Sequence, residues 1–281
     1  MPSRTSLWPA RCALLAVACC AAAIAAAQNP PSGNPSNAND EWLAQSVKLY
    51  YSSAKAGLKA FDCALHPDWR ALYATGNGGL LSSDDAQRVT LLSAVNIALH
   101  GRMQGGSTLD WNPPAQPLNA DQTKLLNDMH DALNQTITGF MQFWTPFVDG
   151  SVVPDSSSGL EVTAAGDGGK KIHLKESDIE LSESFDSGGI LREYDVVQGG
   201  ATVDLTPTFS PGDHGLVITH FHALIRQADD PQKTQEQKTE EMNVEVAYQW
   251  TDGFALPARI DMEVTGVATL HMSLDGCTTQ R

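Results

Sequence analysis

Residues 241–264 read EMNVEVAYQWTDGFALPARIDMEV, and their alternation of apolar and polar residues is the clearest structural pattern in the chain. Apolar side chains occupy every second position in both halves, and polar side chains fill most of the positions between them. In the first half they are Met242, Val244, Val246, Tyr248 and Trp250; in the second half they are Phe254, Leu256, Ala258, Ile260 and Met262. Because successive side chains of a strand point to opposite faces, this period of two predicts strands with one wet face. The link Thr251-Asp252-Gly253 has the length of a hairpin turn.

The same alternation extends back to Gly150. In the segment before the turn at residues 186–189, Ile179, Leu181 and Phe185 alternate with Asp178, Glu180 and Ser184. Further short links stand at residues 198–200 and 265–266, so the pattern predicts seven or eight antiparallel strands. Residues 229–240 form a longer polar stretch, which we interpret as a loop or a short exposed helix.

Before Gly150, two stretches have helical periodicity. The first is expected to start near Asp40, with Pro67 limiting its length, and the second to run from Ala120 to Trp144, with Pro146 ending it. The first apolar stripe contains Leu43, Val47, Tyr50, Ala54, Leu58 and Phe61; the second contains Leu125, Leu126, Met129, Leu133, Ile137, Phe140 and Trp144. Between them, Val95 to Trp111 predicts a hairpin, while residues 83–85 are equally suited to cap a short helix.

Two amphipathic helices and a long one-faced sheet must bury their apolar surfaces against each other. We therefore expect an α+β fold in which a curved antiparallel sheet, a half-barrel, wraps around the two helices. Residues 40–281 form a single domain in this interpretation, with helices and hairpin in 40–150 and the sheet in 151–281. A concave sheet closed by helices often leaves an apolar cavity.

The N-terminus has the order of features of a secretory signal. Arg4 and Arg11 precede a short apolar run, and Ala25-Ala26-Ala27 offers a cleavage site before Gln28. Residues 1–27 are thus a predicted signal peptide, 28–39 a flexible leader, and the periplasm or the exterior the predicted location. The alternative is lipoprotein processing at Cys19.

Charge narrows the range of partners. The chain has a formal net charge of −15, and removing Arg4 and Arg11 with the signal makes it −17. Such a surface repels phosphate backbones and anionic headgroups, so we expect no nucleic-acid partner. No later apolar run is long enough to cross a bilayer, which argues against an integral membrane protein.

Two cysteines remain outside the signal, Cys63 and Cys277. In an exported protein they predict a disulfide between an N-terminal element and the last strand. The alternatives are two free thiols, or a zinc site that adds His66 and His271.

Two segments stand out within the predicted succession of strands: Phe209-Ser210-Pro211-Gly212-Asp213-His214-Gly215-Leu216 and Asp252-Gly253-Phe254-Ala255-Leu256-Pro257-Ala258-Arg259-Ile260. With these features, about residues 160–275 resemble the periplasmic lipoprotein-carrier superfamily. The resemblance implies a curved half-barrel lined by apolar residues, closed by helices, with room for an acyl chain or another apolar ligand.

One cluster suggests metal chemistry. His220 and His222 are two residues apart on a predicted strand, so both face the same way, and Asp213 or His214 could complete a zinc or copper site. The alternative interpretation places these histidines in a central strand, on the same face as Leu216, Ile218 and Leu224, as hydrogen-bonded members of a layered core.

The predicted function is therefore binding of an apolar small molecule or an acylated protein, without a cofactor. No nucleophile elbow, phosphate loop or zinc-protease motif occurs, so an enzyme is the less favoured class. The alternatives are a metal-dependent hydrolase on the His220/His222 strand and an envelope interaction protein without a ligand. The side chains expected to line the cavity are Phe185, Tyr194, Leu205, Tyr248, Trp250, Phe254, Ile260 and Met262.

Overall fold

The computed structural model describes residues 38–74, 79–103, 106–150, 152–226, 239–266 and 268–281. The predicted signal peptide, most of the predicted leader and most of the polar stretch at 229–240 lie outside these residues. The chain divides into two compact units: unit 1 comprises residues 1–52 and 142–243, and unit 2 comprises residues 53–141 and 244–281. Each unit is described by itself.

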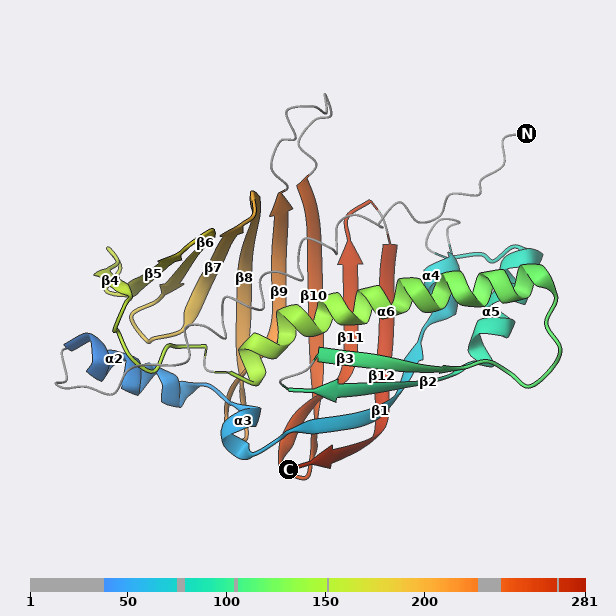
Figure 1. The fold of residues 1–281 in the computed structure, drawn as a ribbon, viewed down its shortest axis with the longest axis horizontal. Helices are drawn as coiled ribbons and strands as arrows, with labels where there is room; N and C mark the ends of the chain where they lie inside the picture. The colour runs from blue at the N-terminus through green and yellow to red at the C-terminus, as the bar shows by residue number, and fades with distance from the viewer. Residues whose placement is uncertain (1–37, 75–78, 104–105, 151, 227–238, 267) are drawn as a thin grey trace. The chain divides into compact units, whose positions relative to one another are not determined.

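Unit 1 is an antiparallel meander preceded by short helical turns (Figure 1). The helical turns are α2 (Ala38–Ser46) and η2 (Val47–Leu49). The strands, each paired with the next, are β4 (Glu161–Ala164), β5 (Lys170–Glu176), β6 (Ile179–Phe185), β7 (Leu191–Gln198), β8 (Ala201–Gly212) and β9 (Gly215–Arg226). The start of β10 (Thr239–Thr251) and the last residues of α6 (Ala120–Val148) also belong to this unit.

Unit 2 contains most of α6 and β10 together with the remaining elements. Its helices are α3 (Ser53–Ala56), α4 (Trp69–Ala74) and α5 (Ser83–Ser93), and its other strands are β1 (Ala60–Pro67), β2 (Asn96–Arg102), β3 (Gly106–Asn112), β11 (Phe254–Val264) and β12 (Ala268–Gln280). The strand order in this unit is β3-β2-β1-β12-β11-β10, so the C-terminal strand lies beside β1. Across the described strands the sheet is open, with β3 and β4 at its edges.

The prediction of a mainly antiparallel sheet accompanied by helices is confirmed. The predicted turns at 186–189, 198–200, 251–253 and 265–266 all separate neighbouring strands. Wrapping of the sheet around two helices stays a prediction.

The first predicted helix is wrong in its length. Regular helix ends at Ser46, and Tyr50 is extended, with φ −97° and ψ 140°. The reason is tertiary, because Tyr50 bridges to Leu216 of β9 and the Tyr51 N–H donates to the Leu216 carbonyl at 2.9 Å. The last member of the predicted stripe, Phe61, is a buried residue of β1.

The second predicted helix begins where expected. Asn119 and Gln122 cap it reciprocally, since each backbone N–H donates to the other side chain, at 3.0 and 2.9 Å. Pro146 does not end it: α6 continues to Val148, and Asp149 N–H donates to the Thr145 carbonyl at 2.8 Å. A proline this close to the end removes only one hydrogen bond from the helix.

Both alternatives for residues 83–111 occur in turn. Helix α5 comes first, capped by Ser82, whose hydroxyl accepts from Asp85 N–H at 3.1 Å. The hairpin of β2 and β3 follows it.

Candidate functional site

The side chains that were predicted to line a cavity are divided between the two units. Phe185, Tyr194 and Leu205 are buried in unit 1. The other five belong to unit 2, where Phe254, Ile260 and Met262 are buried and Tyr248 and Trp250 are half-buried.

In unit 1, one face of the sheet carries a row of buried side chains in register across five strands. Ile172 of β5 pairs with Glu183 of β6, which pairs with Tyr194 of β7; Tyr194 pairs with Leu205 of β8, and Leu205 with Ala223 of β9. All five are buried. We call this side of β5–β9 the inner face.

Aromatic side chains pack on the inner face. Phe147, from the last turn of α6, lies with its ring centroid 5.7 Å from that of Tyr194 and 6.2 Å from that of Phe209. Phe143, one helical turn earlier, lies 5.9 Å from Phe221. The end of α6 that belongs to unit 1 is thus part of the inner-face core.

Glu183 is the polar exception in this row. Its residue is 6% exposed, and its Oε2 atom has no hydrogen-bond partner. Burial raises the pKa of this carboxyl to about 8, because the surroundings disfavour the charged form. At neutral pH the group is therefore mostly a neutral acid, which can donate one hydrogen bond and accept others.

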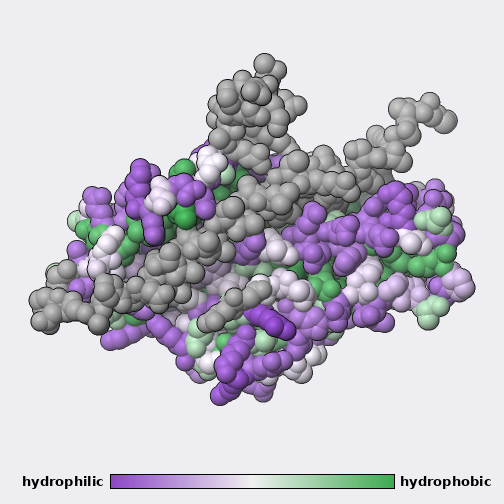
Figure 2. Space-filling view, viewed as in Figure 1, coloured by the Kyte–Doolittle hydropathy of each residue, from purple (hydrophilic) through white to green (hydrophobic). Residues whose placement is uncertain are grey.

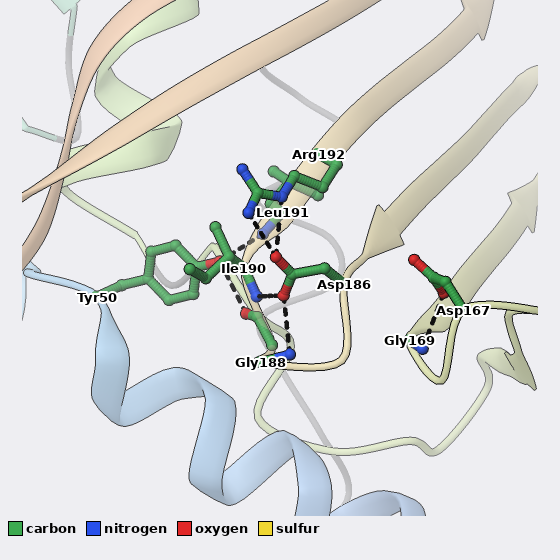
Figure 3. A network of polar contacts seen from close by, with 9 residues as sticks. Tyr50, Asp167, Gly169, Asp186, Gly188, Ile190, Leu191 and Arg192 are labelled. Carbon is green, nitrogen blue, oxygen red and sulfur yellow. Dashed lines mark hydrogen bonds and ion pairs between the residues drawn. The ribbon is translucent and has the colours of Figure 1, made fainter.

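The Tyr50 hydroxyl is hydrogen-bonded to the turn that follows β6 (Figure 3). The Tyr50 hydroxyl donates to the Gly189 carbonyl at 2.9 Å and accepts from Leu191 N–H at 2.7 Å. Burial raises the pKa of Tyr50 above its ordinary value. This neutral phenol connects the segment after η2 to the turn between β6 and β7.

Asp186 organises the same turn from inside, as Figure 3 shows. One carboxylate oxygen accepts from the backbone N–H groups of Gly188 and Ile190, both at 2.9 Å, and the other accepts from Arg192 at 2.9 and 2.6 Å. Burial acts to raise the pKa of Asp186, but the hydrogen bonds from Ile190 and Arg192 outweigh it, so the pKa is lowered. A carboxylate with this many donors holds a turn in place.

The predicted metal ligands are spread along the β8–β9 hairpin. Asp213 and His214 form its exposed turn, between the paired Gly212 and Gly215. At the rise of an extended strand, six residues place His220 roughly 20 Å from His214. His222 is engaged elsewhere, since its Nε2 lies 2.9 Å from Glu241 Oε1.

The predicted faces of β9 need a correction. The β8–β9 register shifts between Thr208 and Phe209, which makes Thr219 the extra residue of β9. As a result Ile218 and Phe221 are both fully buried, whereas His220 and His222 are half-buried. Leu216 and Ile218 are therefore not on the face of the two histidines, whereas Leu224 is. Within the described ranges, no group of three His, Cys, Asp or Glu side chains is arranged to hold a metal ion.

The predicted disulfide is present in unit 2. Cys63 of β1 and Cys277 of β12 are bonded, with their Cα atoms 4.2 Å apart and a separation of 214 in sequence. The alternatives of free thiols and of a zinc site with His66 and His271 are thereby wrong. The Gln249 amide contacts Cys277 Sγ at 3.3 Å.

A hollow of about 360 Å³ lies beside β1 and β2 in unit 2. Its lining combines small and polar residues: Asp62, Cys63, Ala64, Asn96, Ile97, Ala98, Asn112, Gly276 and Thr278. His100 stands next to it, with Nδ1 2.5 Å from Asp62 and Nε2 3.2 Å from Asp110. The hydrogen bond to Asp62 is the main reason that the pKa of His100 is raised. Both imidazole nitrogens are engaged, so His100 is a poor candidate for proton transfer.

On the face seen in Figure 2, hydrophilic residues predominate and hydrophobic residues form small areas between them. Within the described ranges, none of the helices has both the length and the apolar character needed to cross a bilayer.

Comparison with known protein families and with curated proteins found no match to this chain.

Proposed function

We propose that this is an exported protein that binds an apolar ligand, either a small molecule or the acyl chain of a modified protein, on the inner face of unit 1. The observation that carries the proposal is the continuous buried face of β5–β9, built in register by side chains such as Leu181, Val196 and Val203. Sites for apolar ligands are lined mainly by hydrophobic and aromatic side chains, and the inner face carries such side chains on every one of its strands.

Two further features support this proposal. The disulfide between Cys63 and Cys277 is the kind of bond that persists in oxidising compartments, which agrees with the predicted signal peptide. The predicted half-barrel, in which helices close the apolar face, supplies the architecture; Phe143 and Phe147 of α6 already pack on that face in unit 1.

The test is uptake of a fluorescent apolar probe, N-phenyl-1-naphthylamine, by the purified protein. We expect saturable binding with a Kd in the micromolar range, which corresponds to about 8 kcal/mol. Ala223 is fully buried on the inner face, and Ala223→Phe fills the space beside Leu205, so it should abolish uptake.

The matched control is Leu224→Phe, at the next residue of β9, which is half-buried on the opposite face. This variant should bind the probe like the unmodified protein. Circular dichroism and urea unfolding check that both variants fold. Absence of saturable uptake by the folded, unmodified protein would overturn the proposal and favour an interaction protein with a filled core.

A further inference from the structure

The burial of the Glu183 carboxyl group destabilises unit 1, and the fold of this unit does not explain why the group is there. A buried polar atom without a hydrogen bond destabilises a protein by about 1–3 kcal/mol, and polar groups of this kind are almost always paired. Glu183 is 6% exposed, and its Oε2 atom has no hydrogen-bond partner. Its neighbours in register are Ile172 and Tyr194, so it points into the inner face and away from the wet side of β6.

We propose that Glu183 binds the polar head of the apolar ligand, and that this head is neutral, such as an amide, a hydroxyl or an ester. The inference rests on the proposed function, because it names the chemistry of a ligand at the same site. It extends that function by giving the inner face one specificity-determining residue.

The charges around Glu183 favour a neutral head. The cation nearest in register on this face is Lys170, which pairs with Phe185 two positions along β6. Its ammonium donates to Asn39 at 2.6 Å and lies 5.7 Å from the Trp42 ring centroid, so it is already engaged. An anionic head would lose its hydration beside a carboxyl group without gaining this cation.

A cationic head is disfavoured for a related reason. It would have to draw the proton from Glu183 and form an ion pair inside the apolar face, where loss of hydration offsets most of the attraction. A neutral amide or hydroxyl needs no proton transfer, because it accepts the hydrogen bond of the protonated carboxyl and donates one in return.

The experiment compares four ligands with the same twelve-carbon chain: dodecanamide, dodecan-1-ol, dodecanoate and dodecylammonium. Each displaces N-phenyl-1-naphthylamine from the purified protein at pH 6.5, where Glu183 is protonated. We expect the amide and the alcohol to bind about tenfold more tightly than the two charged ligands, which is the effect of one hydrogen bond gained in a buried site.

Two variants test the role of the carboxyl group. Glu183→Gln keeps a neutral donor and acceptor and should keep the preference for the neutral heads. Glu183→Leu removes both and should reduce the preference for the amide by about tenfold while the naphthylamine probe still binds.

The outcomes separate the two proposals. Saturable probe binding without any head preference, or with a preference that survives Glu183→Leu, overturns the inference and leaves the proposed function standing. Tighter binding of dodecanoate or dodecylammonium also overturns it. A complete absence of saturable probe binding in the folded, unmodified protein overturns the proposed function itself.

Discussion

Glu183→Gln keeps the shape and the hydrogen-bonding groups of the side chain but prevents it from ionising, so it should remove a specific pH dependence of stability. Burial raises the pKa of Glu183 from 4.5 to about 8. At a pH between these two values, the carboxyl of Glu183 has lost its proton in the unfolded chain but still holds it in the folded protein. Raising the pH therefore favours unfolding, and the loss is complete once the pH passes about 8.

The size of this loss follows from the two pKa values. Each factor of ten in proton affinity is worth about 1.4 kcal/mol, so a change from 4.5 to about 8 corresponds to a loss of about 5 kcal/mol. The hydroxyl-bearing side chains that face Glu183 are Tyr194 on β7 and Tyr50 from the segment after η2, and burial raises the pKa of Tyr50 above its ordinary value, so this phenol stays neutral throughout this range. On β5, the facing residue is Ile172, which carries no charge.

Urea unfolding at pH 5, 6.5 and 8.5 measures the effect as the difference between the unmodified protein and the variant. This difference is needed because the raised pKa of His100 adds a loss of the same sign: its stabilisation is present at low pH and disappears as the pH rises through the folded pKa. The control is Glu180→Gln on the wet face of β6, where the Lys175 hydrogen bond lowers the pKa of Glu180. Equal pH profiles for the unmodified protein and Glu183→Gln would refute the reasoning.

Three further changes test contacts within the two units. Reduction of the Cys63–Cys277 bond frees a loop of 214 residues and should lower the free energy of unfolding by about 5 kcal/mol, measured by urea titration with and without reductant; an unchanged midpoint contradicts it. Tyr50→Phe leaves two buried backbone groups without their partner and should cost about 2–4 kcal/mol, with retention of full stability counting against the role of the hydroxyl. Gly101→Ala places a methyl group too close to the Phe61 ring to fit without a shift and should lower the melting temperature, whereas no change would show that the ring has room to move.

The strands of this protein could be predicted because their pattern is local. Alternation with a period of two can be recognised from neighbouring residues alone. The turn Thr251-Asp252-Gly253 can be recognised from its composition, because Asp252 and Gly253 both have positive φ, at 53° and 85°, and Asp and Gly are residue types that tolerate such angles. The disulfide was predictable for a different reason, since compartment and residue count leave few ways to use two cysteines.

The first helix could not be bounded from sequence because its end depends on a distant strand. The stripe from Leu43 to Phe61 has helical spacing, yet Tyr50 leaves the helix to pair with Leu216, which follows it by 166 residues in the numbering of the chain. The periodicity shows which side chains are apolar, but it does not indicate which part of the fold will bury them. The irregularity at Thr219 is similar, because it arises from the register of two strands and changes the face of every residue after it.

Glu183 did leave a signal in the sequence. Leu181, Glu183 and Phe185 occupy alternate positions, so the phase that buries the two apolar residues also buries the carboxyl between them. An acidic residue in phase with the apolar set of a strand contradicts the local pattern, and such contradictions concentrate at functional positions because a fold alone gives no reason to keep them. Leucine at this position would satisfy the sheet at least as well, because it would leave no polar atom unpaired on the buried face. What distinguishes glutamate is a buried hydrogen-bonding group that the sheet does not use, and the proposed role of Glu183 depends on that group.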